Sequence, residues 1–125
     1  MGIDIYAEWR GQTEDEIHAQ ASADLSESAQ AGYLRDARDH EPCAMEVLFA
    51  EVCNSADGTA RISAAKLRQR LPVAFALKDI QERIAYGSTD AEVYAVKDRF
   101  RDFVALCEAK EWEMGHSVLI VASYY

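Results

Sequence analysis

The stretch Gly2–Gly11, which reads GIDIYAEWRG, alternates apolar and polar side chains with a period of two. This period is typical of a β-strand that has one face on a hydrophobic core, so we predict a strand over residues 3–9. The core side would carry Ile3, Ile5, Ala7 and Trp9, and the other side Asp4, Tyr6, Glu8 and Arg10. We expect the polar side to face water or a partner rather than a substrate.

The segment HSVLIVASYY (116–125) predicts a second strand. Val118, Ile120, Ala122 and Tyr124 alternate with Leu119, Val121 and Tyr125, so both sides of this strand are largely apolar. Such strands lie in the middle of a sheet and are covered on at least part of each face. We therefore expect the first and last strands to be neighbours in one sheet.

Several segments between these strands show helical signals. Thr13 and Glu16 match a capping box ahead of a short helix over 14–21, which a polar loop to about Gln30 would follow. Ser63 is expected to cap a helix lined by Ala64, Leu67 and Leu71. Pro72 is expected to begin a further helix up to Tyr86, in which the apolar residues Val73, Leu77, Ile80 and Ile84 recur at helical spacing. The clearest helix covers 90–114, where Val93, Val96, Phe100, Phe103 and Cys107 recur three and four residues apart.

The remaining segments are short. Residues 33–39 favour one or two helical turns before Pro42, and residues 44–53 suit a buried strand or a short helix equally. Residues 54–58 are a turn by composition, and residues 59–62 suit an edge strand. The sum is one α+β domain over residues 1–125. It would have an antiparallel or mixed sheet of three or four strands, with helices mainly on one face, including an antiparallel pair formed by 72–86 and 90–114.

Length and composition point to an ordinary globular domain. The chain has 125 residues, of which half are hydrophobic, and no apolar run approaches the length of a membrane span. The first residues lack the basic and apolar regions of a secretory signal, so a cytoplasmic location is expected, with no membrane partner. Cys43, Cys53 and Cys107 are an odd number at wide spacing, which favours reduced thiols over a disulfide framework.

Charge is distributed unevenly along the chain. The net charge is −9, and residues 1–58 alone hold 13 acidic residues against 3 arginines. Residues 58–78 contain no acid, and their bases are Arg61, Lys66, Arg68, Arg70 and Lys78. Lys66, Arg68 and Arg70 raise the alternative of nucleic-acid binding, but the acidic half would repel a polyanion, so nucleic acid is not the expected partner.

The chain shows no motif of an established catalytic or cofactor site. HExxH, CxxC, GxSxG and phosphate-loop patterns are all missing from the sequence, so no metal or cofactor is expected. Asp4 and Glu8 would lie roughly 13 Å apart along a strand, too far to act as a glycosidase-type carboxylate pair. We therefore favour a non-enzymatic protein over an enzyme.

Two sets of residues are predicted to carry function. The first is an acidic surface for a basic protein partner or a second copy of the chain, with aromatic and arginine anchors: Trp9, Glu14, Asp15, Glu16, Tyr33, Arg35, Asp36 and Asp39. The second is a small-molecule or substrate pocket between the first strand and the 32–42 loop, formed by Asp4, Glu8, Tyr33, Arg35 and His40.

Three stretches carry a resemblance. The start MGIDIYAEW, the internal AGYLR at 31–35 and the end VASYY resemble small uncharacterised proteins of bacteria and of their phages or mobile elements. The resemblance spans most of the chain and implies context rather than mechanism. Small acidic proteins of mobile elements include inhibitors of host defence such as anti-CRISPR proteins, so by analogy an inhibitor is one expectation.

Overall fold

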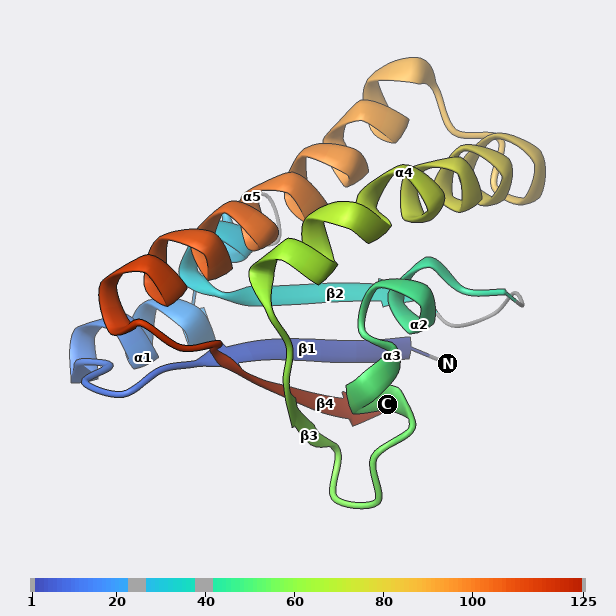
Figure 1. Ribbon diagram of the computed structural model, residues 1–125. Helices are drawn as coiled ribbons and strands as arrows, with labels where there is room; N and C mark the ends of the chain where they lie inside the picture. Colours follow the sequence, from blue (N-terminus) through green and yellow to red (C-terminus); the bar gives the residue numbers. More distant parts are fainter. Residues whose placement is uncertain (1, 23–26, 38–41, 125) are drawn as a thin grey trace.

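A four-stranded antiparallel sheet forms one layer of the protein, with the strand order β2-β1-β4-β3 (Figure 1). This computed structural model describes residues 2–22, 27–37 and 42–124. The strands are β1 (Gly2–Glu8), β2 (Tyr33–Ala37), β3 (Thr59–Arg61) and β4 (Leu119–Tyr124). The first and last strands pair at the centre of the sheet, with Ile5 opposite Ala122, as their alternation predicted.

The second layer is helical. Its elements are α1 (Glu14–Ser22), the 3₁₀ turn η1 (Ser28–Ala31), α2 (Ala44–Leu48), α3 (Ala50–Cys53), α4 (Ala64–Ile80), the π-helical turn η2 (Gln81–Ala85) and α5 (Asp90–Met114). In Figure 1, α4 and α5 lie side by side above the sheet and run in opposite directions, while α1 lies beside the C-terminal end of α5. The predicted α+β class, with the terminal strands adjacent, is confirmed.

The core lies between the two layers and follows the predicted periodicities. Ile3, Ile5 and Ala7 of β1 are fully buried, and every member of the predicted stripe of α5 is buried as well. Phe49 and Phe103 meet edge to face in the middle of this core, with ring centroids 5.4 Å apart. Burial of these apolar side chains supplies most of the driving force for folding.

The helix starts also follow the sequence. Thr13 and Glu16 form both hydrogen bonds of the predicted capping box, at 3.0 and 3.1 Å. The hydroxyl of Ser63 accepts a hydrogen bond from the amide of Lys66, and Thr89 begins α5 with a second capping box. Each cap pairs a main-chain N–H that the helix itself leaves without a partner.

Two segments differ from the predictions. Residues 33–37 are strand β2 rather than helical turns, because Leu34 enters the core opposite Ile5 while Tyr33 and Arg35 lie on the other face. Residues 38 and 39 of that prediction lie outside the described part of the chain. Residues 28–31, expected as loop, form η1, and residues 44–53 resolve into two short helices.

Pro72 does not begin a helix, because α4 runs through it without interruption. Proline has no N–H to donate to the preceding turn, which normally weakens a helix interior. Leu71 and Ala74, on either side of it, are buried in the core. Tertiary packing on these neighbours therefore holds the helix through the proline.

Of the apolar repeat Val73, Leu77, Ile80 and Ile84, Leu77 is partly buried against the core, but the other three members do not face the core as a helical stripe would suggest. Val73, Ile80 and Ile84 are 54%, 59% and 80% exposed. The buried side of this helical segment instead carries Leu71, Ala74, Lys78 and Gln81, which recur at equally helical spacing. Two of these four are polar, so hydrophobicity alone selected the wrong face.

Candidate functional site

A groove of about 480 Å³ lies where α1, η1 and α5 meet beside the end of β1. Its described lining, which we call the Trp9 groove, consists of Trp9, Glu16, Ala19, Glu27, Gln30, Ala31, Leu106 and Lys110. The lining combines one large aromatic ring with two carboxylates and one ammonium group. Such a mixture suits a ligand that is itself cationic or amphipathic.

Gln20 and Gly32 fix the walls of the Trp9 groove. The amide nitrogen of Gln20, a buried side chain, donates to the carbonyls of Ala7 and Gly32, both at 2.8 Å, and so ties α1 to the ends of two strands. Gly32 has a positive φ of 95°, and a Cβ there would lie 2.8 Å from the Gln20 amide and 3.3 Å from the Trp9 ring. Only glycine allows this close approach.

Lys110 projects from α5 into the groove and meets both kinds of lining group. Its Nζ lies 5.0 Å from the centroid of the Trp9 ring and 3.5 Å from a carboxylate oxygen of Glu16. A second carboxylate, that of Glu113, lies 3.4 Å from the same Nζ. Hydrogen bonding from Thr13, with a smaller contribution from Lys110, lowers the pKa of Glu16, which keeps this carboxylate ionised.

The acidic surface predicted from the first half of the chain is only partly assembled. Glu16, Asp36 and Glu51 pair with Lys110, Lys78 and Arg70 of the second half. Asp24, Asp39 and Glu41 lie outside the described residues. Glu27 is exposed in the lining of the Trp9 groove, and Glu14 and Asp15 are exposed in the first turn of α1; the described residues provide no ion-pair partner for these three. The predicted residues that come together in the Trp9 groove are therefore Trp9 and Glu16.

Asp4, Tyr33 and Arg35 also come together, but on the face of the sheet opposite the core. The Tyr33 hydroxyl donates to an Asp4 carboxylate oxygen at 2.8 Å, and the Arg35 Nε lies 3.2 Å from the same oxygen. Tyr6 stacks on Tyr33 with ring centroids 4.9 Å apart. Burial, followed by the hydrogen bond to Asp4, raises the pKa of Tyr33 and keeps it neutral.

This arrangement corrects the geometry of the predicted pocket between the first strand and the 32–42 loop. Residues 33–37 pair directly with β1 as a neighbouring strand, with Asp4 opposite Arg35, so the two segments do not form opposing walls. Glu8 is exposed at the end of β1, and His40 lies outside the described residues. The described members of the set therefore line a sheet face.

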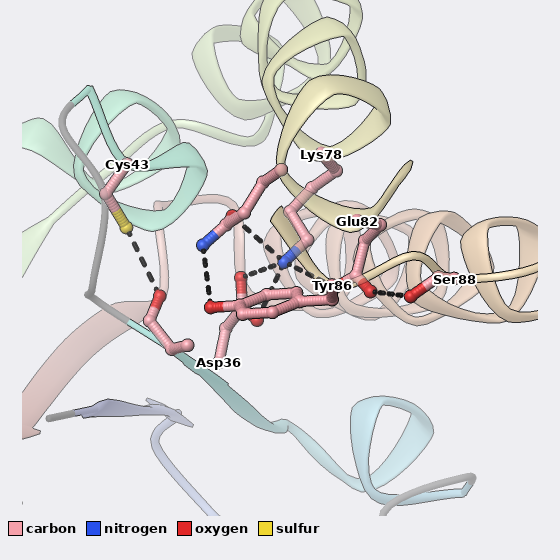
Figure 2. Close-up of polar contacts among 8 residues, drawn as sticks. Asp36, Cys43, Lys78, Glu82, Tyr86 and Ser88 are labelled. Carbon is pink, nitrogen blue, oxygen red and sulfur yellow. Dashed lines mark hydrogen bonds and ion pairs between the residues drawn. The ribbon is translucent and has the colours of Figure 1, made fainter. Parts of the chain in front are cut away.

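Asp36 occupies a third place, a buried ionic centre between β2, α4 and η2 (Figure 2). Lys78 is fully buried, and its Nζ lies 2.9 Å from both carboxylate oxygens of Asp36 and 3.0 Å from Glu82. The side-chain oxygen of Gln81 accepts a further hydrogen bond from Lys78 at 3.2 Å. Burial raises the pKa of Asp36, whereas hydrogen bonds from Ser88 and Lys78 outweigh the effect of burial at Glu82 and lower its pKa.

Neighbouring side chains form hydrogen bonds with other polar groups of this centre. Ser88 donates to Glu82 at 2.7 Å, and Gln81 donates to the Tyr86 hydroxyl at 3.4 Å (Figure 2). The Cys43 thiol is directed toward the main-chain oxygen of Ala37, and burial raises the pKa of this thiol, so it stays protonated. The centre therefore joins three elements of the fold, and Asp36 is taken up in it rather than displayed on the surface.

The basic segment is largely engaged within the chain as well. Arg68 pairs with Glu108, and Arg70 binds both carboxylate oxygens of Glu51, at 2.7 and 3.1 Å. Lys66 remains exposed on α4. Two of the three side chains considered for phosphate contacts are thus neutralised by carboxylates.

Trp9 and Glu16 were among the residues predicted to carry function, whereas Lys110 and Lys78 were not. Lys110 interrupts the apolar stripe of α5 near its end, and that interruption was the available signal.

Among the described residues, no cluster of three His, Cys, Asp or Glu side chains is placed to hold a metal ion. No described helix is both long and apolar enough to span a bilayer. No family model, curated protein or solved structure matches the chain.

Proposed function

We propose that the protein is a non-enzymatic binding module whose Trp9 groove receives a lysine or arginine side chain of a protein partner. The supporting observation is the position of Lys110, whose ammonium group lies near the Trp9 ring and the Glu16 carboxylate. An indole face flanked by carboxylates favours a cation, because the ring quadrupole and the negative charges act in the same direction. The groove thus already holds the type of group that a partner would supply.

The proposal requires the ammonium group of Lys110 to give way to the incoming cation. Its distances of 3.5 Å to Glu16 and 3.4 Å to Glu113 exceed the roughly 2.7–2.9 Å of a strong ammonium–carboxylate hydrogen bond. An incoming cation therefore replaces weak contacts. The exposed carboxylate of Glu27 in the groove, with those of Glu14 and Asp15 in the first turn of α1, adds a negative field that speeds the approach of a basic partner.

A fluorescence titration tests this proposal. In a Trp112→Phe background, which leaves Trp9 as the sole indole, lysine-rich and arginine-rich peptides are added, with a glutamate-rich peptide as control. We expect saturable binding of the basic peptides that weakens with added salt. Glu27→Gln weakens this binding, whereas Lys110→Ala strengthens it because the internal competitor is gone.

Two control variants make the same changes in charge away from the Trp9 groove. Asp98→Asn removes a negative charge from the exposed surface of α5, and Lys66→Ala removes a positive charge from α4. If Lys110→Ala and Lys66→Ala have equal effects, or if no basic peptide binds saturably, the proposal is rejected. A difference confined to the groove variants supports it.

The narrower form of the proposal is inhibition of a bacterial defence system in the cytoplasm, as an anti-CRISPR protein does. It is supported by the exposed carboxylates, because nucleic-acid-binding enzymes present basic grooves that such a surface fills. The test adds the protein, or its Glu27→Gln variant, to a purified CRISPR nuclease and measures cleavage of target DNA. Unchanged cleavage rejects this narrower form, whereas the peptide titration decides the broader one.

A further inference from the structure

Glu16 presents its two carboxylate oxygens to different partners. Oε1 accepts a hydrogen bond from the main-chain N–H of Thr13 at 3.0 Å, as one half of the capping box of α1. Oε2 lies 3.5 Å from the Lys110 ammonium group in the Trp9 groove. One oxygen is therefore engaged by the helix cap, and the other is the oxygen that a ligand in the groove meets.

The capping box also fixes the direction of this carboxylate. Thr13 and Glu16 are tied in both directions, since the Thr13 hydroxyl accepts a hydrogen bond from the Glu16 N–H at 3.1 Å. A carboxylate held in this way loses little further side-chain entropy when a ligand binds. The groove thus offers one oriented acceptor oxygen together with the indole ring of Trp9.

Lysine and arginine side chains differ in what they need from such a site. An arginine guanidinium is planar and pairs best with a carboxylate through two parallel hydrogen bonds, one to each oxygen. Arg70 and Glu51 of this chain form such a pair. A lysine ammonium is a compact charge whose three N–H donors point to separate acceptors, so one oxygen and one ring face suit it.

The side chain that already lies in the groove shows the second pattern. The Nζ of Lys110 lies near one oxygen of Glu16, near one oxygen of Glu113 at 3.4 Å and near the Trp9 ring at 5.0 Å. These three acceptors come from three different residues and match the three donors of an ammonium group. The space between Trp9 and Glu16 therefore suits an ammonium group better than a forked guanidinium.

We propose that the Trp9 groove selects lysine over arginine, because the cap of α1 leaves only Oε2 of Glu16 available to the ligand. The selectivity rests on the proposed function and narrows the partner to a protein that presents an exposed lysine. The exposed carboxylate of Glu27 adds negative charge that attracts either basic side chain, so it contributes affinity without selectivity.

Matched peptides test the selectivity. In the Trp112→Phe background, Trp9 fluorescence is followed while three peptides are added that differ only at one central residue, which is lysine, arginine or trimethyllysine. We expect the lysine peptide to bind about tenfold more tightly than the arginine peptide, a difference of about one charge-assisted hydrogen bond. Trimethyllysine keeps the positive charge but has no N–H to donate, so its peptide should bind about as weakly as the arginine peptide.

A variant of Glu16 tests which oxygen the ligand meets. Glutamine also serves at the last position of a capping box, so Glu16→Gln keeps the cap through its amide oxygen. Its amide nitrogen, a donor, then takes the place of Oε2 and faces the ammonium group. We expect the lysine peptide to bind about tenfold more weakly. Asp15→Asn, the same loss of charge at the neighbouring position of α1, should weaken binding less than about threefold.

The outcomes separate the selectivity from the function on which it rests. Equal binding of the lysine and arginine peptides overturns the selectivity but leaves a groove that binds cations. Equal binding of lysine and trimethyllysine overturns the role of Oε2, as do equal effects of Glu16→Gln and Asp15→Asn. If no basic peptide binds saturably, the proposed function itself is rejected. The peptide comparison changes nothing in the groove, so it decides the proposal even if Glu16→Gln disturbs α1.

Discussion

Lys78 and Asp36 form a forked ion pair inside the protein, with the ammonium nitrogen 2.9 Å from each oxygen of the carboxylate. Lys78 comes from α4 and Asp36 from β2, so this contact joins the helical layer to an outer strand of the sheet. Glu82 shares the same ammonium group at 3.0 Å. One fully buried cation therefore pairs with two largely buried carboxylates.

Replacing Lys78 with methionine is expected to be strongly destabilising. The substitution keeps an unbranched apolar side chain up to the ε position but leaves Asp36 and Glu82 without their shared cation. Removing one partner of a buried ion pair costs about 3–5 kcal/mol. Urea denaturation measures the change, and Lys66→Met, an exposed lysine on the same helix, serves as the control with an expected loss below about 0.5 kcal/mol. Equal losses in the two variants contradict this role.

The ion pair between Arg70 and Glu51 is expected to make the free energy of unfolding depend on pH. The pKa of Glu51 is lowered in the folded state, and the hydrogen bond from Arg70 is the largest cause. A carboxylate with a lowered folded-state pKa stabilises the fold above its unfolded pKa and loses that contribution as the pH falls through the folded value.

The native chain and Glu51→Gln are therefore expected to differ by about 1 kcal/mol at neutral pH, a value suited to a half-exposed bidentate pair. The difference should shrink below about pH 4. Denaturation midpoints measured across this range check it, and a difference that grows on acidification refutes the assignment.

Gly32 and Gly11 offer a matched pair of glycine substitutions. Both have positive φ, 95° and 83°, so alanine is strained at either place. A Cβ at Gly11 meets nothing within 4 Å, whereas one at Gly32 lies 2.8 Å from Gln20 and 3.1 Å from Leu106. Gly11→Ala should cost about 1 kcal/mol from the backbone alone, and Gly32→Ala distinctly more. Thermal unfolding of the two variants gives the comparison; a smaller loss at Gly32 would show that α1 can shift freely.

The three thiols are expected to react at very different rates. Burial raises the pKa of Cys107 to about 12 and also raises that of Cys43, whereas Cys53 is only partly buried. Thiolates are the reactive form, so an aromatic disulfide reagent at about pH 8 should modify Cys53 first. Cys43 and Cys107 should react only after unfolding in urea. The fast phase should disappear in Cys53→Ser, and its persistence there would place a second thiol at the surface.

Period-two and helical patterns located the central strands and α5 because these elements bury one continuous apolar face. The same patterns failed at β2. Residues 33–37 contain only Leu34 as a large core side chain, and the strand is set by its register against β1 and by the turn at Gly32. A short stretch of sequence does not reveal pairing with a strand that is distant in the chain.

The candidate site was only half accessible to sequence reasoning, for a similar reason. Trp9 and Glu16 stand close together in the chain and could be proposed as a set, whereas Lys110 reaches them from a helix about a hundred residues later. On α4, two helical stripes compete for the core. The less apolar one is buried because Asp36 and Glu82 provide partners for Lys78, and those partners come from other turns and strands.

The pairing of β1 with β4 has a consequence for biosynthesis. Residues 2–8 leave the ribosome early, whereas their partners at 119–124 follow more than a hundred residues later. The middle of the sheet therefore closes last, and contacts of such long sequence separation slow folding. Until then, the apolar side of the early strand depends on local collapse or on a chaperone for protection from aggregation.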